Sequence, residues 1–205
     1  GDNMWALVES GSITKIINNP KGMVIGDVRY SRKIFFLWSK SEREAKGIYE
    51  IVFDNSKKKD GDWYINTDVS YAFANGKVTA SYGDATAKAH ADTLYTADDE
   101  SNGLGTEGDV KVEGLKTIKI RTLKNQAAGI LQETDWYIVR KADAGTAVPS
   151  AITNHRAAVR TKAAEQETAI TNASDTPALE TLYTYTEQED GSVTRPLGEL
   201  PTLEV

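Results

Sequence analysis

The 205-residue chain contains no cysteine and only two histidines, His90 and His155. The absence of cysteine excludes thiol catalysis, cysteine-ligated zinc, iron–sulfur clusters and disulfide scaffolds. The two histidines are far apart in the sequence and neither lies in an HExxH pattern, so a multi-histidine metal site within one chain is not expected. No phosphate-binding loop, GxSxG elbow or dinucleotide fingerprint is present either, and we therefore expect no cofactor.

Long hydrophobic segments are also missing. The longest strongly apolar run, Ile34 to Trp38, is far shorter than the roughly 20 residues of a membrane-spanning helix. The N-terminal residues contain neither a basic segment nor a long apolar segment, so no secretory signal is expected. These features predict a soluble protein that does not act on a membrane.

The net charge of −6 is unevenly distributed along the chain. Residues 1–83 contain twelve Lys or Arg and ten Asp or Glu, whereas residues 84–205 contain twelve and twenty. An acidic half repels phosphate backbones, and the one basic triplet, Lys57–Lys59, is flanked by aspartates. Nucleic acid is therefore not expected as a partner.

Residues 1–83 are expected to be rich in β-strands. Two apolar runs, Met4–Glu9 and Ile13–Ile17, flank a Ser-Gly-Ser turn and predict a hairpin. A short helix is predicted between Ser39 and Gly47. Ser39 can cap it, acidic residues lie in its first turn, and Gly47 can end it. Further strands are predicted at Ile48–Phe53, at Trp63–Phe73 and at Val78–Tyr82, the last two joined by a tight turn at Asn75–Gly76.

The composition changes after residue 83. Residues 84–94 are alanine-rich and compatible with a helix, and residues 97–109 form a polar segment with three glycines. Apolar residues then recur at spacings of three and four over 110–133 and over 151–172, which predicts two amphipathic helices. Trp136–Val139 interrupts the first stripe. The short connection favours an antiparallel helical hairpin.

These patterns together predict an α+β fold, with an N-terminal antiparallel β meander and short helix followed by a C-terminal helical hairpin and a short β tail. We divide the chain into a β-rich domain (1–83), a helix and glycine- and acid-rich connector (84–109), the helical hairpin (110–175) and an extended tail (176–205). Asp190–Gly191 lies between two β-prone runs of that tail and is typical of a hairpin turn.

The connector contains a weak calcium-loop pattern. Asp98, Glu100 and Asn102 stand at the first, third and fifth positions of such a loop, Gly103 at the sixth and Asp109 at the twelfth. Glutamate at the third position and the short aspartate at the twelfth depart from the pattern. A solvated connector without metal is the alternative.

Carboxylate pairs are candidates for acid–base chemistry, namely Asp98 with Asp99 and Glu187 with Glu189. No motif brings two carboxylates together across a cleft, which a glycan hydrolase requires. An enzyme is therefore kept only as a third hypothesis, and no catalytic residue is assigned.

The aromatic residues admit two interpretations. Each tryptophan lies in or beside an expected element, so packing in the core is the simpler interpretation for all of them: Trp5, Trp38, Trp63 and Trp136. The alternative is that Trp63, Tyr64 and Tyr71 form an exposed aromatic surface that binds a sugar or a partner protein.

The junction of the two expected helices resembles the phage tail assembly chaperone family over about forty residues. The family pattern is a helix ending in Leu-x-x-Thr-Asp-Trp, a short link with proline, and a helix carrying Tyr-Arg-x-x-[Leu/Val]-Arg. Here Leu131 precedes Thr134, Asp135 and Trp136, the link contains Val148–Pro149, and the second helix carries His155, Arg156, Val159 and Arg160. His155 replaces the usual tyrosine.

The same motif also has a purely structural interpretation. Thr134 and Asp135 can end the first helix with side-chain hydrogen bonds, and Trp136 can cover the open end of the hairpin. Arg156 and Arg160 share a helix face and can pair with Glu133 or Asp135 or with acidic groups of another chain.

The β-rich front, with its segment 41–49 and its Asn75–Gly76 hairpin, is similar to N-terminal segments of phage tail-fibre accessory proteins. The two resemblances imply a non-enzymatic assembly chaperone that binds a phage tail or tail-fibre protein in the host cytoplasm. Trp63, Tyr64 and Tyr71 are then the expected contacts, with the helical hairpin as a second surface. The alternative is a structural or host-recognition subunit of the virion tail that binds glycans, and a homo-oligomer is compatible with either function.

Overall fold

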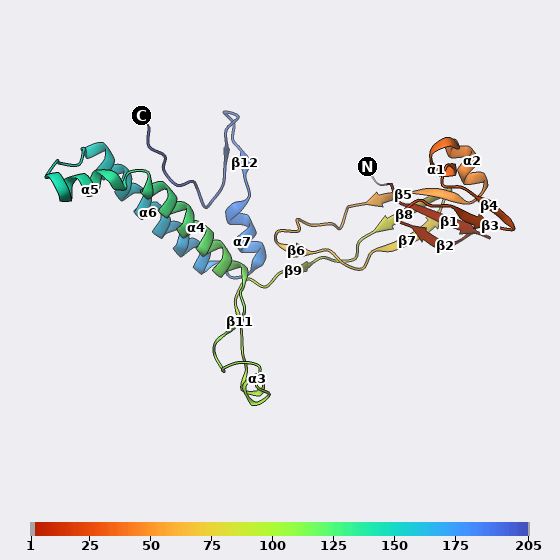
Figure 1. The fold of residues 1–205 in the computed structure, drawn as a ribbon, viewed down its shortest axis with the longest axis horizontal. Coiled ribbons are helices and arrows are strands. Elements are labelled where there is room, and N and C mark those ends of the chain that lie inside the picture. The colour runs from red at the N-terminus through yellow and green to blue at the C-terminus, as the bar shows by residue number, and fades with distance from the viewer. Residues whose placement is uncertain (1–2, 205) are drawn as a thin grey trace. The chain divides into compact units, whose positions relative to one another are not determined.

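The computed structural model describes residues 3–204 and divides the chain into two compact units, residues 1–86 and 87–205 (Figure 1). Strands dominate the first unit and helices the second, so the predicted α+β class is confirmed. Within residues 3–204, no helix combines the length and apolar character needed to cross a membrane.

A five-stranded sheet forms the first unit, in the order β2-β1-β5-β8-β7. Its strands are β1 (Trp5–Glu9), β2 (Ser12–Ile17), β5 (Ile48–Asp54), β7 (Ser70–Ala74) and β8 (Lys77–Ser81). The hairpins β1–β2 and β7–β8 are antiparallel, as predicted, and positive φ angles at Gly11 and Gly76 form their turns. The predicted antiparallel meander is wrong at one step, because β5 and β8 pair in parallel. The long excursion between them allows a crossover, which a parallel pair requires.

Shorter elements complete the first unit. A hairpin of β3 (Met23–Ile25) and β4 (Val28–Tyr30) turns at Gly26, and α1 (Ile34–Leu37) follows; none of these was predicted. The predicted short helix is α2 (Lys40–Ala45), which begins with a reciprocal capping box between Ser39 and Glu42. The strand expected over residues 63–73 is interrupted: β6 covers Tyr64–Ile65 and β7 begins only at Ser70. Strand β9 (Thr86–Ala87) lies at the boundary of the two units.

Alternation along β1 places its side chains in two different apolar clusters. Trp5 and Leu7 pack with residues of β2, β3, α1 and β5, whereas Ala6 faces a second cluster with Ile51, Val78 and Ala80. Successive side chains of a strand point to opposite faces, so a single strand can contribute to both clusters. Both faces of the sheet are therefore covered near β1.

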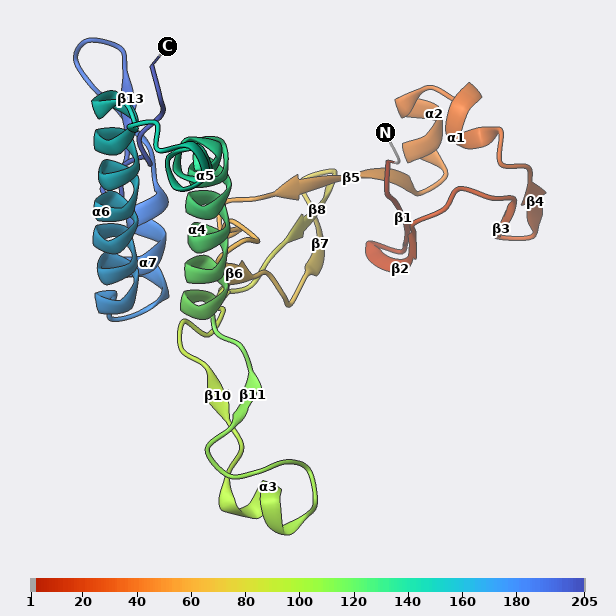
Figure 2. The ribbon, with the colours of Figure 1, turned by 60° about the vertical axis from the view of Figure 1, so that its left-hand side comes forward.

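The second unit is built on two long antiparallel helices, α4 (Leu115–Gln132) and α6 (Ser150–Asn172), which lie side by side (Figure 2). The predicted amphipathic stripes are buried at Leu123 and Ala127 on α4 and at Val159 on α6. Helix α7 (Thr176–Tyr183) and the segment around Leu197 pack on this pair. A terminal hairpin of β12 (Thr186–Glu187) and β13 (Val193–Thr194) agrees with the predicted β tail.

Three expectations for the second half are wrong. Residues 84–94 form no helix, because alanine-rich residues without an apolar stripe gain little from helix formation. Strand β10 (Thr93–Leu94) lies at the end of this segment. The expected break at Trp136–Val139 is instead inside α5 (Asp135–Ala144), which ends at Gly145 with φ 71°. Part of the expected tail is α7, because the Asp175 side chain accepts the amide N–H of Ala178 and caps the helix.

A projecting segment, which we call the finger, comprises residues 93–112. It consists of β10, α3 (Ala97–Ser101) and β11 (Val110–Val112), and β10 pairs antiparallel with β11. Both views show it extending away from the helices at the N-terminal end of α4 (Figures 1 and 2). The Asp92 carboxylate anchors its base, because its Oδ1 accepts the Gly114 amide and the Thr117 hydroxyl at 2.7 Å each.

Candidate functional site

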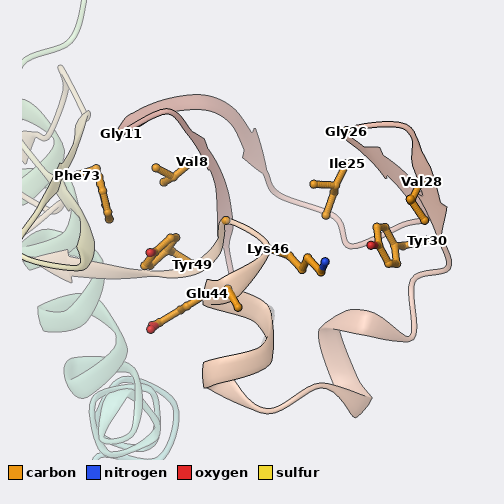
Figure 3. A pocket seen from close by; sticks show the side chains of 12 residues that line it. Val8, Gly11, Ile25, Gly26, Val28, Tyr30, Glu44, Lys46, Tyr49 and Phe73 are labelled. Carbon is orange, nitrogen blue, oxygen red and sulfur yellow. The ribbon is translucent and has the colours of Figure 1, made fainter.

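The first unit has an open groove with a volume of about 520 Å³ (Figure 3). One wall is formed by Val8, Tyr49 and Phe73 of the five-stranded sheet. The other is formed by residues of the β3–β4 hairpin, namely Ile25, Val28 and Tyr30. The turn after α2 contributes Lys46, whose exposed side chain extends between the walls (Figure 3). The volume is in the range of ligand-binding pockets, and aromatic walls with a few polar groups are typical of them.

Strand register explains why one face of the hairpin lines the groove. Ile25 pairs with Val28, so these two side chains lie on the same face of the two-stranded ladder. Val24 pairs with Arg29, and this pair lies on the opposite face. Val28 is 53% exposed although it lines the groove. The hairpin therefore presents an apolar face to the groove, on which Val28 is exposed while Ile25 packs partly against the core cluster that contains Trp5.

The aromatic rings of the groove are held by neighbouring rings. The ring centroids of Tyr49 and Phe73 are 5.0 Å apart, and those of Tyr30 and Trp38 are 5.2 Å apart in an edge-to-face arrangement. Such pairs contribute about 0.5–1.5 kcal/mol beyond their burial. The walls are consequently positioned before any ligand arrives.

Gly47 closes one side of the groove and admits no side chain. Its φ is +84°, and a Cβ atom there would lie 2.2 Å from the carbonyl oxygen of Val8. The backbones of Val8 and Gly47 lie this close because the Val8 amide donates a hydrogen bond of 2.7 Å to the Gly47 carbonyl. Glycine at this position therefore allows α2 and β5 to approach β1.

A second candidate region is the corner where α4, α5 and α6 meet. The Arg156 guanidinium donates hydrogen bonds to the Leu131 carbonyl at 2.7 Å and to the Thr134 hydroxyl at 2.8 Å, and it pairs with the Asp135 carboxylate at 2.9 Å. Thr134 is 2% exposed. The Leu131 carbonyl lies near the C-terminal end of α4 and also accepts the amide and the hydroxyl of Thr134, at 3.1 Å each. One cation thus joins the ends of three helices.

This corner agrees in part with the sequence-based expectations. The predicted pairing of Arg156 with Asp135 is found, whereas Arg160 is exposed. Trp136 does not pack in the core: it is 51% exposed and stacks on Tyr137 with ring centroids 3.7 Å apart. Several residues of α5 are exposed, and the sequence pattern predicted a break here instead of a continuous helix.

We call the exposed apolar residues of α5 the α5 surface; they are Trp136, Ile138 and Val139. Ile138 is 44% exposed and Val139 64%. The guanidinium carbon of Arg140 lies 4.9 Å from the ring centroid of Trp136. The Arg140 Nε atom is buried and has no hydrogen-bond partner in the part of the chain that the structure describes. Tryptophan and arginine at an exposed site are typical of protein interfaces.

The aromatic surface predicted from Trp63, Tyr64 and Tyr71 does not exist in the predicted form. Trp63 is 6% exposed and Tyr64 8%, and Tyr71 is half-buried against the cluster that contains Val78. The simpler interpretation, packing of the tryptophans, holds for Trp63 and also for Trp5. Burial of large aromatic area stabilises the fold and leaves little of these side chains for a partner.

The calcium-loop pattern also fails to form a ligand cluster. The Asp99 side chain accepts the Thr96 amide, which holds the pKa of this carboxyl below its usual range, and it pairs with Lys111 at 3.3 Å. A Glu100 oxygen accepts the Glu107 amide. Helix α3 begins inside the supposed loop, so the predicted ligands Asp98, Glu100, Asn102 and Asp109 do not converge. Within residues 3–204, no group of three His, Cys, Asp or Glu is able to hold a metal.

The carboxylate pairs suggested for acid–base chemistry lie in two separate exposed segments of the second unit. Asp98 lies in the finger, and Glu187 and Glu189 lie in or beside β12. All three side chains are exposed to solvent. These three carboxylates are therefore solvated in the part of the chain that the structure describes.

The groove was missed by sequence reasoning because its walls come from segments distant in the chain. The signal that could have found the β3–β4 hairpin is the apolar alternation of Met23, Ile25, Val28 and Tyr30 around Gly26. Comparison with known proteins adds nothing here: no protein-family model, no curated protein and no solved structure matches this chain.

Proposed function

We propose that this chain is a non-enzymatic assembly chaperone that binds a phage tail or tail-fibre protein through the groove of its first unit. The observation that carries the proposal is the apolar, aromatic-lined groove beside a two-stranded hairpin. A chaperone of assembly must cover an apolar or edge-strand segment of its client until the client oligomerises, and this groove offers both kinds of contact.

The hairpin supplies the backbone contacts. Among the described residues, β3 and β4 pair only with each other, so each strand has an outer edge of amide and carbonyl groups. An extended client segment can add to such an edge as a further strand. Alternate side chains of the client then point toward Ile25 and Val28 and fill the groove between the hairpin and Tyr49.

The choice of client follows from the resemblance of the α4–α5–α6 corner to phage tail assembly chaperones. The contacts of Thr134, Asp135 and Arg156 hold this corner together. The α5 surface is a second exposed apolar area for protein contacts. We place this activity in the host cytoplasm during virion assembly.

The test is co-expression with a phage tail-fibre protein as the client. Co-expression is expected to raise the yield of soluble, oligomeric fibre. The Val28→Lys variant is expected to abolish this gain because it places a charge on the groove face of the hairpin. Val24→Lys is the matched control, since Val24 is 50% exposed on the opposite face of the same hairpin. Equal fibre yield with and without the chain, or equal loss with both variants, contradicts the proposal.

The aromatic walls also favour a second candidate function, a virion tail subunit that binds glycans for host recognition. Tyr30, Tyr49 and Phe73 offer the apolar ring surfaces on which a sugar can lie. Mass spectrometry of purified virions separates the two functions. A chaperone is expected to be absent from mature particles, whereas a recognition subunit is present in a fixed ratio to the other tail proteins.

A further inference from the structure

We infer that the second unit binds a neutral saccharide in a groove between helix α4 and the C-terminal segment of the chain. This groove, which we call the C-terminal groove, has a volume of about 690 Å³, and its lining residues come from α4, α6 and residues 185–200. The inference goes beyond the proposed function, since the client is bound by the groove of the first unit and this groove belongs to the second.

One face of α4 forms the floor of the C-terminal groove. Gln126, Gly129, Ile130 and Glu133 line the groove, and their spacing of three and four residues places them on the same side of the helix. Gln126 and Glu133 are two helical turns apart, which is about 10 Å along the axis. The floor therefore has a polar side chain at each end and only Gly129 and Ile130 between them.

The glycine in this floor is not required by the fold. A Cβ atom at Gly129 would meet no other atom of the described chain within 4 Å, and its φ lies outside the left-handed region. Glycine inside a helix is less favourable than alanine, because it loses more backbone entropy on folding. What the missing side chain provides is an open stretch of α4 backbone, which a ligand can approach closely.

The opposite wall of the groove is held in place by polar contacts. Gln166 is 3% exposed, and its side-chain amide donates hydrogen bonds to the carbonyls of Leu197 at 3.3 Å and Gly198 at 3.1 Å. The Arg195 Nε atom donates to the same Gly198 carbonyl at 3.0 Å and pairs with the Glu199 carboxylate at 3.2 Å. The C-terminal segment is therefore fixed against α6 before a ligand arrives.

The charges of the groove favour a ligand without negative charge. Among the described residues that line it, the charged side chains are Glu133, Arg195 and Glu199, so the net charge of the lining is −1. Arg195 is engaged by Glu199, which also accepts the hydroxyl of Tyr185. The lining therefore offers no uncompensated cation to a phosphate, sulfate or carboxylate group.

A sugar supplies the chemistry that complements this groove. The Tyr185 residue is 50% exposed, and its ring is held by Arg195, whose guanidinium carbon lies 5.3 Å from the ring centroid. The apolar C–H face of a sugar can lie on such an aromatic ring. Sugar hydroxyls both donate and accept, so they can pair with the exposed amide of Gln126 and the exposed carboxylate of Glu133. A short neutral oligosaccharide laid over Gly129 makes all of these contacts.

The first experiment exposes the full chain to an array of immobilised oligosaccharides that contains neutral glycans together with their sulfated and sialylated counterparts. We expect binding to neutral glycans, and calorimetry with the best of them in solution then gives the dissociation constant. Binding to no glycan, or only to the anionic glycans, overturns the inference.

A change in the floor then locates the sugar. Gly129→Leu is expected to weaken binding about tenfold or more, because the new side chain fills the groove. Its urea midpoint is expected to stay the same or rise, since leucine favours a helix more than glycine, so the loss does not come from unfolding. Ala128→Leu is the matched control, because Ala128 is exposed on α4 and does not line this groove. Unchanged binding by Gly129→Leu, or equal loss with both variants, overturns the site.

Two further pairs of variants test the contacts. Tyr185→Phe keeps the ring and is expected to bind like the parent chain, whereas Tyr185→Ala is expected to bind more weakly; equal loss with both contradicts packing of the sugar on the ring. Glu133→Gln keeps a hydrogen-bonding group and is expected to retain most of the binding that Glu133→Ala loses. A loss with Glu133→Gln as large as that with Glu133→Ala means that a cationic ligand is recognised, and it overturns the neutral saccharide.

The outcomes remain separable from those for the proposed function. Gly129→Leu is expected to raise the yield of soluble fibre like the parent chain, because the groove of the first unit is untouched. Loss of glycan binding with Val28→Lys but not with Gly129→Leu places the sugar in the first unit and overturns the inference. Absence of glycan binding leaves the client-binding proposal standing, since co-expression measures it independently.

Discussion

Replacing Arg156 with alanine is expected to destabilise the helical unit by about 3 kcal/mol. The Arg156 side chain is only 13% exposed, and its hydrogen bonds reach the Leu131 carbonyl and the hydroxyl of Thr134. Hydrogen bonds made by a charged group contribute about 1.5–3 kcal/mol each. The Leu131 carbonyl and the Thr134 hydroxyl remain bonded to each other without Arg156, so no further loss is added for an unpaired buried group. The pairing with Asp135 adds less than about 1 kcal/mol, since the Asp135 side chain is 55% exposed and well screened.

The assay is urea unfolding followed by circular dichroism at a wavelength dominated by helix. The Arg156→Ala variant is expected to unfold at a lower midpoint with an unchanged dependence on urea, because the amount of surface exposed on unfolding stays the same. Asp135→Asn separates the ion pair from the other contacts and is expected to cost less than about 1 kcal/mol.

Arg160→Ala is the matched control, since Arg160 is exposed one turn further along α6 and surface changes of this kind cost less than about 0.5 kcal/mol. If Arg156→Ala and Arg160→Ala lower the free energy of unfolding equally, the role of Arg156 in joining the helix ends is refuted. A loss with Asp135→Asn as large as that with Arg156→Ala means instead that the ion pair dominates.

Two further changes test other parts of the structure. Gly47→Ala is expected to lower the free energy of unfolding of the first unit by about 2 kcal/mol or more, because the new Cβ meets the Val8 carbonyl and the left-handed backbone disfavours alanine; a neutral effect in chemical denaturation refutes this. The Gly114 amide, and to a lesser extent the Thr117 hydroxyl, hold the pKa of Asp92 below its usual value of 3.8. The ionised carboxylate therefore stabilises the fold fully above pH 3.8, and this stabilisation is lost as the pH falls through the lowered pKa. Asp92→Asn is therefore expected to be less stable than the parent chain at pH 6, with the difference closing near pH 2, and a difference that does not depend on pH contradicts the role of the charge.

The sequence by itself determined the local elements with strong signals. The capping residues at Ser39 and the Asn75–Gly76 dipeptide predicted α2 and the β7–β8 turn, because caps and positive φ angles depend on a few neighbouring residues. The apolar stripes of α4 and α6 predicted the helical pair, since a helix buries one face wherever it packs. For Arg156 the sequence left Glu133, Asp135 and acidic groups of another chain open as partners, and the structure shows the pair with Asp135.

Only the tertiary structure decided which segments meet. The parallel pairing of β5 with β8, the burial of Trp63 and the groove between Tyr49 and Val28 all join residues that are distant in the chain. Local pattern carries no information on these contacts, because the same apolar side chain can be buried by any element that reaches it. The exposure of Trp136 has the same cause, because whether another element reaches α5 is decided only in the folded chain.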